Sequence, residues 1–117
     1  MIKISTPLFL TEDEEKIKKS LESMFGISFK NKGKRIVGET KKINVLVKIK
    51  QKIDESRIKN TILYLIEKNK IGNTSKLELN KQTFMLGKIH FVEEDYPLGN
   101  ITIEFDDVEK VVDYLTT

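Results

Sequence analysis

The stretch ITIEFDDVEKVVDYL, residues 101–115, changes its hydrophobic period partway along. Residues 101–105 alternate apolar and polar side chains, which predicts a strand with one buried face. From Asp106 onward the apolar residues recur at helical spacing, and Asp106 and Glu109 have the pattern of a helix cap. A strand that runs directly into a helix with one apolar face predicts a sheet with a helix packed on it.

The start of the chain has the same arrangement. Residues 2–6 alternate as a strand does, and Pro7 ends or bends it. Thr11 and Glu14 have the capping-box spacing, so we expect a helix that ends at Gly26. Its buried face would be formed by Ile17, Leu21, Met24 and Phe25.

Between these two units the sequence predicts shorter elements. We expect strands at residues 27–29, 36–38, 77–79 and 89–91, with turns at 31–34 and 97–100. Two more helices are expected, one beginning at Asp54 or Ser56 and ending before Gly72, the other capped by Asn80 and closed by Gly87.

Residues 43–49 fit two different structures. Ile43, Val45, Val47 and Ile49 alternate as in a strand, and β-branched residues favour strands. Helical spacing is equally satisfied, because Ile43, Leu46, Val47 and Lys50 fall on one face of a helix. The periodicity leaves both alternatives open.

These elements are typical of an α+β fold, with one mostly antiparallel sheet and helices packed on one face. A chain of 117 residues has the length of one domain, so we expect residues 1–117 to form a single α+β domain. There is no cysteine, no signal peptide and no apolar run of about 18 residues, which predicts a cytoplasmic protein that does not enter a membrane.

The sequence contains no recognisable catalytic or metal-binding motif. His90 is the only histidine, so neither a zinc site nor a convincing catalytic triad can be built around it. Glycine-rich phosphate loops and the EF-hand spacing are absent as well. We therefore expect no enzyme activity, no cofactor, no metal and no small-molecule substrate.

Charge is distributed unevenly along the chain. Residues 30–88 contain sixteen Lys and Arg against five Asp and Glu, whereas residues 93–113 contain eight acids and one lysine. Such asymmetry points to an anionic partner. The alternative is that the lysines only form a solvated surface, because nineteen of the 21 basic residues are lysine.

Nucleic-acid binding is the function class that this charge distribution favours. Lysines at a hairpin tip and in the following element can follow a phosphate backbone. Arg35 and Arg57 are the only arginines, so sequence-specific readout of bases is not expected. Phe29 is the one aromatic residue beside the basic stretch. The candidate phosphate contacts here are Lys30, Lys32, Lys34, Arg35, Lys41 and Lys42.

Several segments together resemble a family of small archaeal proteins that has been described as predicted RNA-binding. They are Thr11–Lys16, Val37–Glu39, Leu79–Gln82 followed by Gly87–Lys88, and Pro97–Gly99, in that order along the chain. The family is similar in fold to the domain of a large-subunit ribosomal protein that contacts 5S ribosomal RNA.

The resemblance implies an α+β homodimer with a helix at residues 43–52, and it implies no catalytic residues. It also draws attention to Lys81 and Lys88, which could present an ammonium and backbone amides to a phosphate near a helix start. Asn80 would equally serve as an ordinary helix cap. Two functions follow: non-sequence-specific binding of structured RNA through a lysine-rich face, or a dimeric protein-interaction or scaffold module without nucleic acid.

Overall fold

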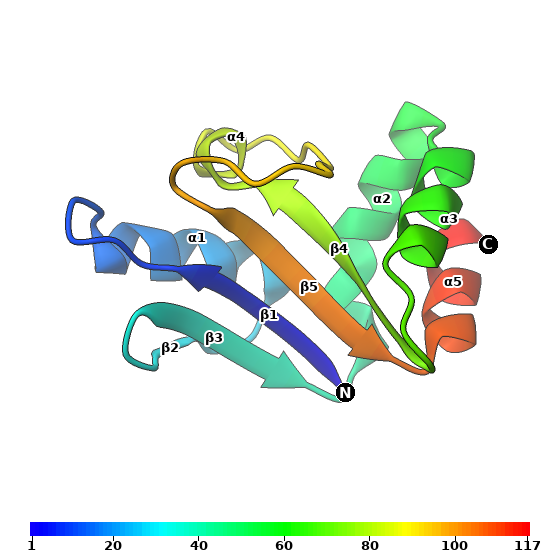
Figure 1. The fold of residues 1–117 in the computed structure, drawn as a ribbon, viewed down its shortest axis with the longest axis horizontal. Helices are drawn as coiled ribbons and strands as arrows, with labels where there is room; N and C mark the ends of the chain where they lie inside the picture. The colour runs from blue at the N-terminus through cyan, green and yellow to red at the C-terminus, as the bar shows by residue number, and fades with distance from the viewer.

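The computed structural model describes all of residues 1–117. Its centre is a five-stranded sheet in the order β2–β3–β1–β5–β4, in which every neighbouring pair is antiparallel (Figure 1). The strands are β1 (Ile2–Pro7), β2 (Lys30–Asn31), β3 (Arg35–Thr40), β4 (Thr74–Asn80) and β5 (Asn100–Asp106).

Five α-helices accompany the sheet, and a 3-10 turn at Ile43–Leu46 leads into the second of them. They are α1 (Glu14–Phe25), α2 (Val47–Ser56), α3 (Lys59–Lys68), α4 (Lys81–Met85) and α5 (Val108–Thr116). Helix α1 lies behind the sheet, while α2, α3 and α5 pack together toward its β4 edge (Figure 1). The predicted α+β fold is confirmed.

One cluster of buried apolar side chains joins the sheet to the helices. The strands contribute alternate residues, such as Ile2 and Ile4 on β1 and Ile103 and Phe105 on β5. The helices contribute their one-sided stripes, among them Ile17, Leu21, Ile49, Ile53, Ile62, Val111 and Leu115. Burying each such side chain contributes about 1.5–3 kcal/mol, so packing rather than intrinsic propensity holds these short helices in place. No helix combines the length and the apolar character needed to span a membrane.

The start of α1 differs from the prediction. Asp13 precedes the helix, and its carboxylate accepts the N–H of Lys16 at 3.2 Å, so the predicted cap at Thr11 is wrong. The end at Gly26 is confirmed, with a φ of 70° that favours glycine.

Residues 43–56 are helical, so the helical alternative for this segment is right and the strand alternative is wrong. The predicted start of a helix at Asp54 or Ser56 is also wrong, because α2 ends there and α3 begins at Lys59. Between them Arg57 takes a left-handed φ of 54°.

Two predicted strands do not form. Residues 27–29 form no strand, and β2 begins only after them, at Lys30. Residues 89–91 make a single bridge, between Phe91 and Leu79. Their apolar residues are nevertheless packed against the core. Alternating apolar and polar residues indicate that one side of the segment is buried, and a segment can be buried on one side without pairing to another strand.

The cap of α5 also differs from the prediction. Asp107 precedes the helix with a φ of 50° and makes no side-chain cap, while Asp106 pairs with the N-terminal amine of Met1 at 2.7 Å. The hydrogen bond from this amine is the main cause that lowers the pKa of Asp106. Asp106 therefore ties the start of β1 to the end of β5.

Candidate nucleic-acid interface

The β2–β3 hairpin carries four exposed cations, Lys30, Lys32, Lys34 and Arg35, which we call the hairpin cations. The N–H of Lys32 donates to the carbonyl of Arg35 at 2.8 Å, and Gly33 supplies the φ of 76° in this turn. None of the four forms an ion pair. All four charges are therefore free to meet an anion.

The hairpin is fixed to the rest of the molecule. The N–H of Leu8 donates to the carbonyl of Lys34 at 2.7 Å, and Arg35 Nη2 donates to Ser5 Oγ at 3.0 Å. The side-chain amide of Asn31 donates to Glu14 on α1. These contacts hold the turn against β1 and α1, so the cations are presented from a supported loop.

Lys41 and Lys42 lie beyond the opposite end of β3 from the hairpin. Both are exposed. At about 3.3 Å per residue, the strand separates them from Arg35 by about 20 Å. The structure therefore does not bring the six predicted cations of this stretch together, and one ligand would have to span that length.

Lys81 differs from the other candidates because its side chain is buried, with 1% exposed. Its ammonium donates to Glu12 Oε1 at 2.8 Å, to the carbonyl of Leu98 at 3.2 Å and to the carbonyl of Pro7. An ammonium has three donors, and all three are used here. Lys81 therefore has no free donor to offer a phosphate.

The contacts of Lys81 join segments that are far apart in the sequence. The loop after β1, the start of α4 and the turn before β5 all meet at its ammonium. Gly99 in that turn has a φ of 78°, and a Cβ on it would lie 2.3 Å from Pro7 Cγ. Three of the segments that carry the family resemblance thus converge on one structural contact.

Asn80 and Lys88 lie on either side of α4. Asn80 Oδ1 accepts the N–H of Thr83 at 2.9 Å, so the predicted cap is confirmed. Lys88 is exposed and forms no ion pair, which leaves it available to an anion.

The exposed aromatic residues are not those expected from the sequence. Phe29 is buried, with its ring over Gly38. Tyr64 on α3 is 57% exposed, and Phe9 and Tyr96 are 41% and 38% exposed, in the loops that follow β1 and precede β5. Phe9 follows Leu8, whose backbone N–H donates to Lys34 of the hairpin, and the ammonium of Lys81 lies 5.6 Å from the centre of the Phe9 ring. In the sequence, only the position of Phe9 in the loop after Pro7 could have indicated that its side chain is exposed.

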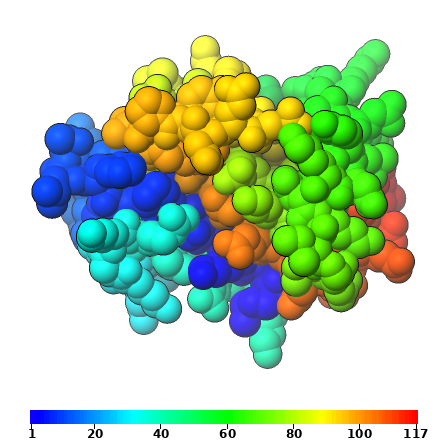
Figure 2. Space-filling model, in the orientation of Figure 1, coloured from blue at the N-terminus to red at the C-terminus, as the bar shows by residue number.

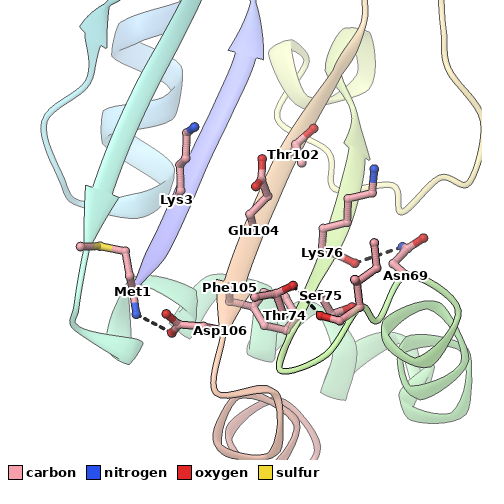
Figure 3. Close-up of a pocket in the computed structure, with 11 residues that line it drawn as sticks. Met1, Lys3, Asn69, Thr74, Ser75, Lys76, Thr102, Glu104, Phe105 and Asp106 are labelled. Carbon is pink, nitrogen blue, oxygen red and sulfur yellow. Dashed lines mark hydrogen bonds and ion pairs between the residues drawn. The ribbon is translucent and has the colours of Figure 1, made fainter.

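The face of the sheet turned away from the core is polar and carries both signs of charge. Cross-strand pairing places Glu39, Lys3, Glu104 and Lys76 side by side across β3, β1, β5 and β4. Directly paired residues point to the same side of a sheet, so these four form an alternating row that we call the charge row. Figure 3 shows its members Lys3, Glu104 and Lys76.

A hollow of 540 Å³ lies over part of this face, beside the turn that follows α3. In Figure 2 the face lies recessed between α3 and the hairpin segment. Glu104 and Asp106 line the hollow together with Lys3 and Lys76. Because both signs of charge line this hollow, it lacks the single sign of charge that focuses a field on an anion such as a phosphate. No group of three or more His, Cys, Asp or Glu is arranged to hold a metal ion.

Comparison with known proteins finds a family model and relatives that match most of the chain. A family model described as RNA binding matches residues 1–115. A UPF0201 protein of Sulfurisphaera tokodaii is 34% identical over 115 residues, covering 91% of this chain and 79% of the relative. A UPF0201 protein of Methanothermobacter thermautotrophicus is 26% identical over 120 residues, covering 97% and 89%.

Solved structures share the fold. The crystal structure of a UPF0201 protein from Methanococcus jannaschii aligns with a TM-score of 0.77 at 24% identity, over 99% of this chain and 98% of that one. Another UPF0201 crystal structure aligns with a TM-score of 0.73 at 25% identity, over 90% and 80%. The likeness to the ribosomal protein domain stays a prediction.

Proposed function

The chain belongs to the UPF0201 family of small archaeal proteins, and from this premise we propose that it binds structured RNA through the hairpin cations. The observation that carries the proposal is the set of four exposed, unpaired cations on one supported turn. Phosphate contacts of this kind supply affinity without reading sequence. Phe9, in the loop that follows β1, is 41% exposed, and its ring offers a surface on which an unpaired base can stack.

The test is a fluorescence titration of a labelled RNA stem-loop at several salt concentrations. Each phosphate that a lysine neutralises adds about 0.7–0.9 to the slope of log affinity against log salt. We expect Lys32→Gln with Lys34→Gln to weaken binding and to lower that slope by about 0.7–0.9 for each lysine that touches a phosphate. The matched control, Lys70→Gln with Lys110→Gln, removes two exposed lysines elsewhere and should leave the slope unchanged.

A stem-loop that does not bind the wild-type protein even at low salt would refute the proposed function. Equal losses of affinity in the hairpin and control variants would show that net charge, rather than the hairpin, attracts the RNA.

A second candidate is a homodimer that acts as an interaction module, and the charge row supports it. A two-fold axis parallel to the strands, between β1 and β5, would place Lys3 over Glu104 of a second copy and Glu39 over Lys76. The row is therefore complementary to itself, as a two-fold interface requires. Sedimentation equilibrium tests this arrangement.

Lys3→Glu should weaken such a dimer, because two carboxylates would then face each other across the axis. The double variant Lys3→Glu with Glu104→Lys should restore it by exchanging the two charges. A monomeric wild-type protein, or a double variant as weak as the single one, would rule out this geometry.

A further inference from the structure

Two hollows on the helix side of the molecule are joined through shared lining residues. One, of 340 Å³, lies where α1, α2 and α4 meet, and the other, of 530 Å³, lies between the end of α1 and the 3-10 turn before α2. Ser23, Met24 and Lys48 line both hollows. The two hollows are therefore adjacent, and together we call them the α1 groove.

All of the charged residues that line the α1 groove are lysines: Lys19, Lys42 and Lys48. All three are exposed. No Asp or Glu lines either hollow, whereas Glu104 and Asp106 line the hollow on the sheet face. A cleft lined by one sign of charge focuses its field on ligands of the opposite sign. This groove therefore favours an anion more than the hollow of mixed charge on the sheet face does.

Lys48 crosses the groove. Its ammonium donates to the carbonyl of Ser23 in the last turn of α1 at 3.0 Å. That end of a helix carries partial negative charge, which would oppose an anion. Lys48 offsets this charge and still has two of its three donors free. Lys19 and Lys42 form no ion pair, so their ammonium groups are also available.

Part of the floor of the groove is apolar. Met24 and Met85 line it and are partly buried. Methionine side chains adapt to irregular partners, and thioethers compete little for hydrogen bonds. Such a floor with lysines at its rim suits a sugar–phosphate strand, whose charge faces the rim and whose sugars pack below.

We propose that the α1 groove is a second phosphate-backbone contact, which holds one strand of the structured RNA bound at the hairpin. This inference rests on the proposed function and extends it to the helix side of the molecule. Lys41 next to Lys42, and Lys88 next to Gly87, add exposed cations near the two ends of the groove. The exposed candidate lysines outside the hairpin, Lys41, Lys42 and Lys88, thereby all lie in or beside the α1 groove.

Methyl NMR of methionine tests the groove directly. The chain has three methionines: Met24 and Met85 line the groove, while Met1 lines the hollow on the sheet face. In protein labelled with ¹³C at the methionine methyl groups, Met85→Leu identifies one signal. On addition of the RNA stem-loop we expect the Met24 and Met85 signals to move to saturation and the Met1 signal to stay in place.

RNA that binds without moving the Met24 and Met85 signals, or that moves only Met1, would overturn the groove assignment and leave the proposed function standing. RNA that does not bind at all would overturn both. If poly-glutamate moves the two signals and RNA does not, the groove binds an acidic protein segment and the inference is wrong.

A charge variant gives a second readout. Lys19→Gln with Lys48→Gln should weaken binding of the stem-loop and lower the salt slope by roughly 1.4–1.8, the value for two neutralised phosphates. Lys70→Gln with Lys110→Gln is again the control, since neither residue lines the groove. Equal losses of affinity in the two variants would contradict the inference.

Discussion

Lys81 and Glu12, which are 69 residues apart in the sequence, form an ion pair whose lysine is 1% exposed and whose Nζ and Oε1 atoms are 2.8 Å apart. Glu12 Oε1 also accepts the N–H of Phe9 at 3.0 Å. The pair therefore positions the loop that presents Phe9 to solvent.

Removing the lysine of this pair should destabilise the fold strongly. Lys81→Met leaves the Glu12 carboxylate without its counter-ion, and removing one partner of a buried pair costs about 3–5 kcal/mol. Urea unfolding measures the change in the free energy of unfolding. Lys88→Met, which removes an exposed lysine nearby, should change it by less than about 0.5 kcal/mol. Equal effects in the two variants would contradict a structural role for Lys81.

Gly99 should tolerate alanine less well than Gly33 does. Both have left-handed φ values, 78° and 76°, but only a Cβ on Gly99 would meet Pro7. We expect Gly33→Ala to cost about 1–2 kcal/mol in backbone strain. Gly99→Ala should cost a further ~1–3 kcal/mol from overpacking. Thermal unfolding of the two variants side by side tests the difference, and similar melting temperatures would refute it.

Arg57 is expected to be a site where glycine stabilises the protein. It joins α2 to α3 with a φ of 54°, and the N–H of Ile58 donates across this turn to the carbonyl of Ile53 at 3.3 Å. Arg57→Gly relieves about 1 kcal/mol of left-handed strain. Arg57→Ala keeps the strain and should bring no gain. A Gly variant less stable than the wild type by urea unfolding would count against this explanation.

The ion pair between Met1 and Asp106 predicts a dependence of stability on acidic pH. The pKa of Asp106 is lowered in the folded state, so its contribution is present above the unfolded-state pKa and is lost as the pH falls through the folded value. Asp106→Asn should therefore destabilise the protein near neutral pH and have a progressively smaller effect as the pH falls through the acidic range. Asp113→Asn, which removes a carboxylate without an ion pair, is the control. An effect of Asp106→Asn that does not change with pH would contradict the assignment.

The pattern of apolar residues was enough to predict the fold class and most elements. Where the period was unambiguous, as in residues 2–6 and 101–105, the strands are confirmed. The apolar residues of 43–49 fit both the strand period and the helix period. The segment is helical because that structure packs Val45, Leu46 and Ile49 into the core.

The candidate site was harder to predict, because exposure depends on contacts between distant segments. Lys81 has the same side chain as Lys88, yet Pro7, Glu12 and Leu98 enclose only the first. Phe9 and Phe29 are equally apolar, but only Phe29 has a glycine opposite to receive its ring. Lys19 and Lys48 could not be predicted as a pair, because a groove between helices has no signature in a single segment.

The order of the strands has a consequence for synthesis on the ribosome. The first strand made, β1, lies between β3 and β5, and β5 is the last strand to emerge. Until residue 106 leaves the exit tunnel, one edge of β1 has no partner and offers its backbone hydrogen bonds to other chains. The nascent protein is therefore vulnerable to edge-to-edge aggregation throughout most of translation, and chaperone capture during that interval would protect it.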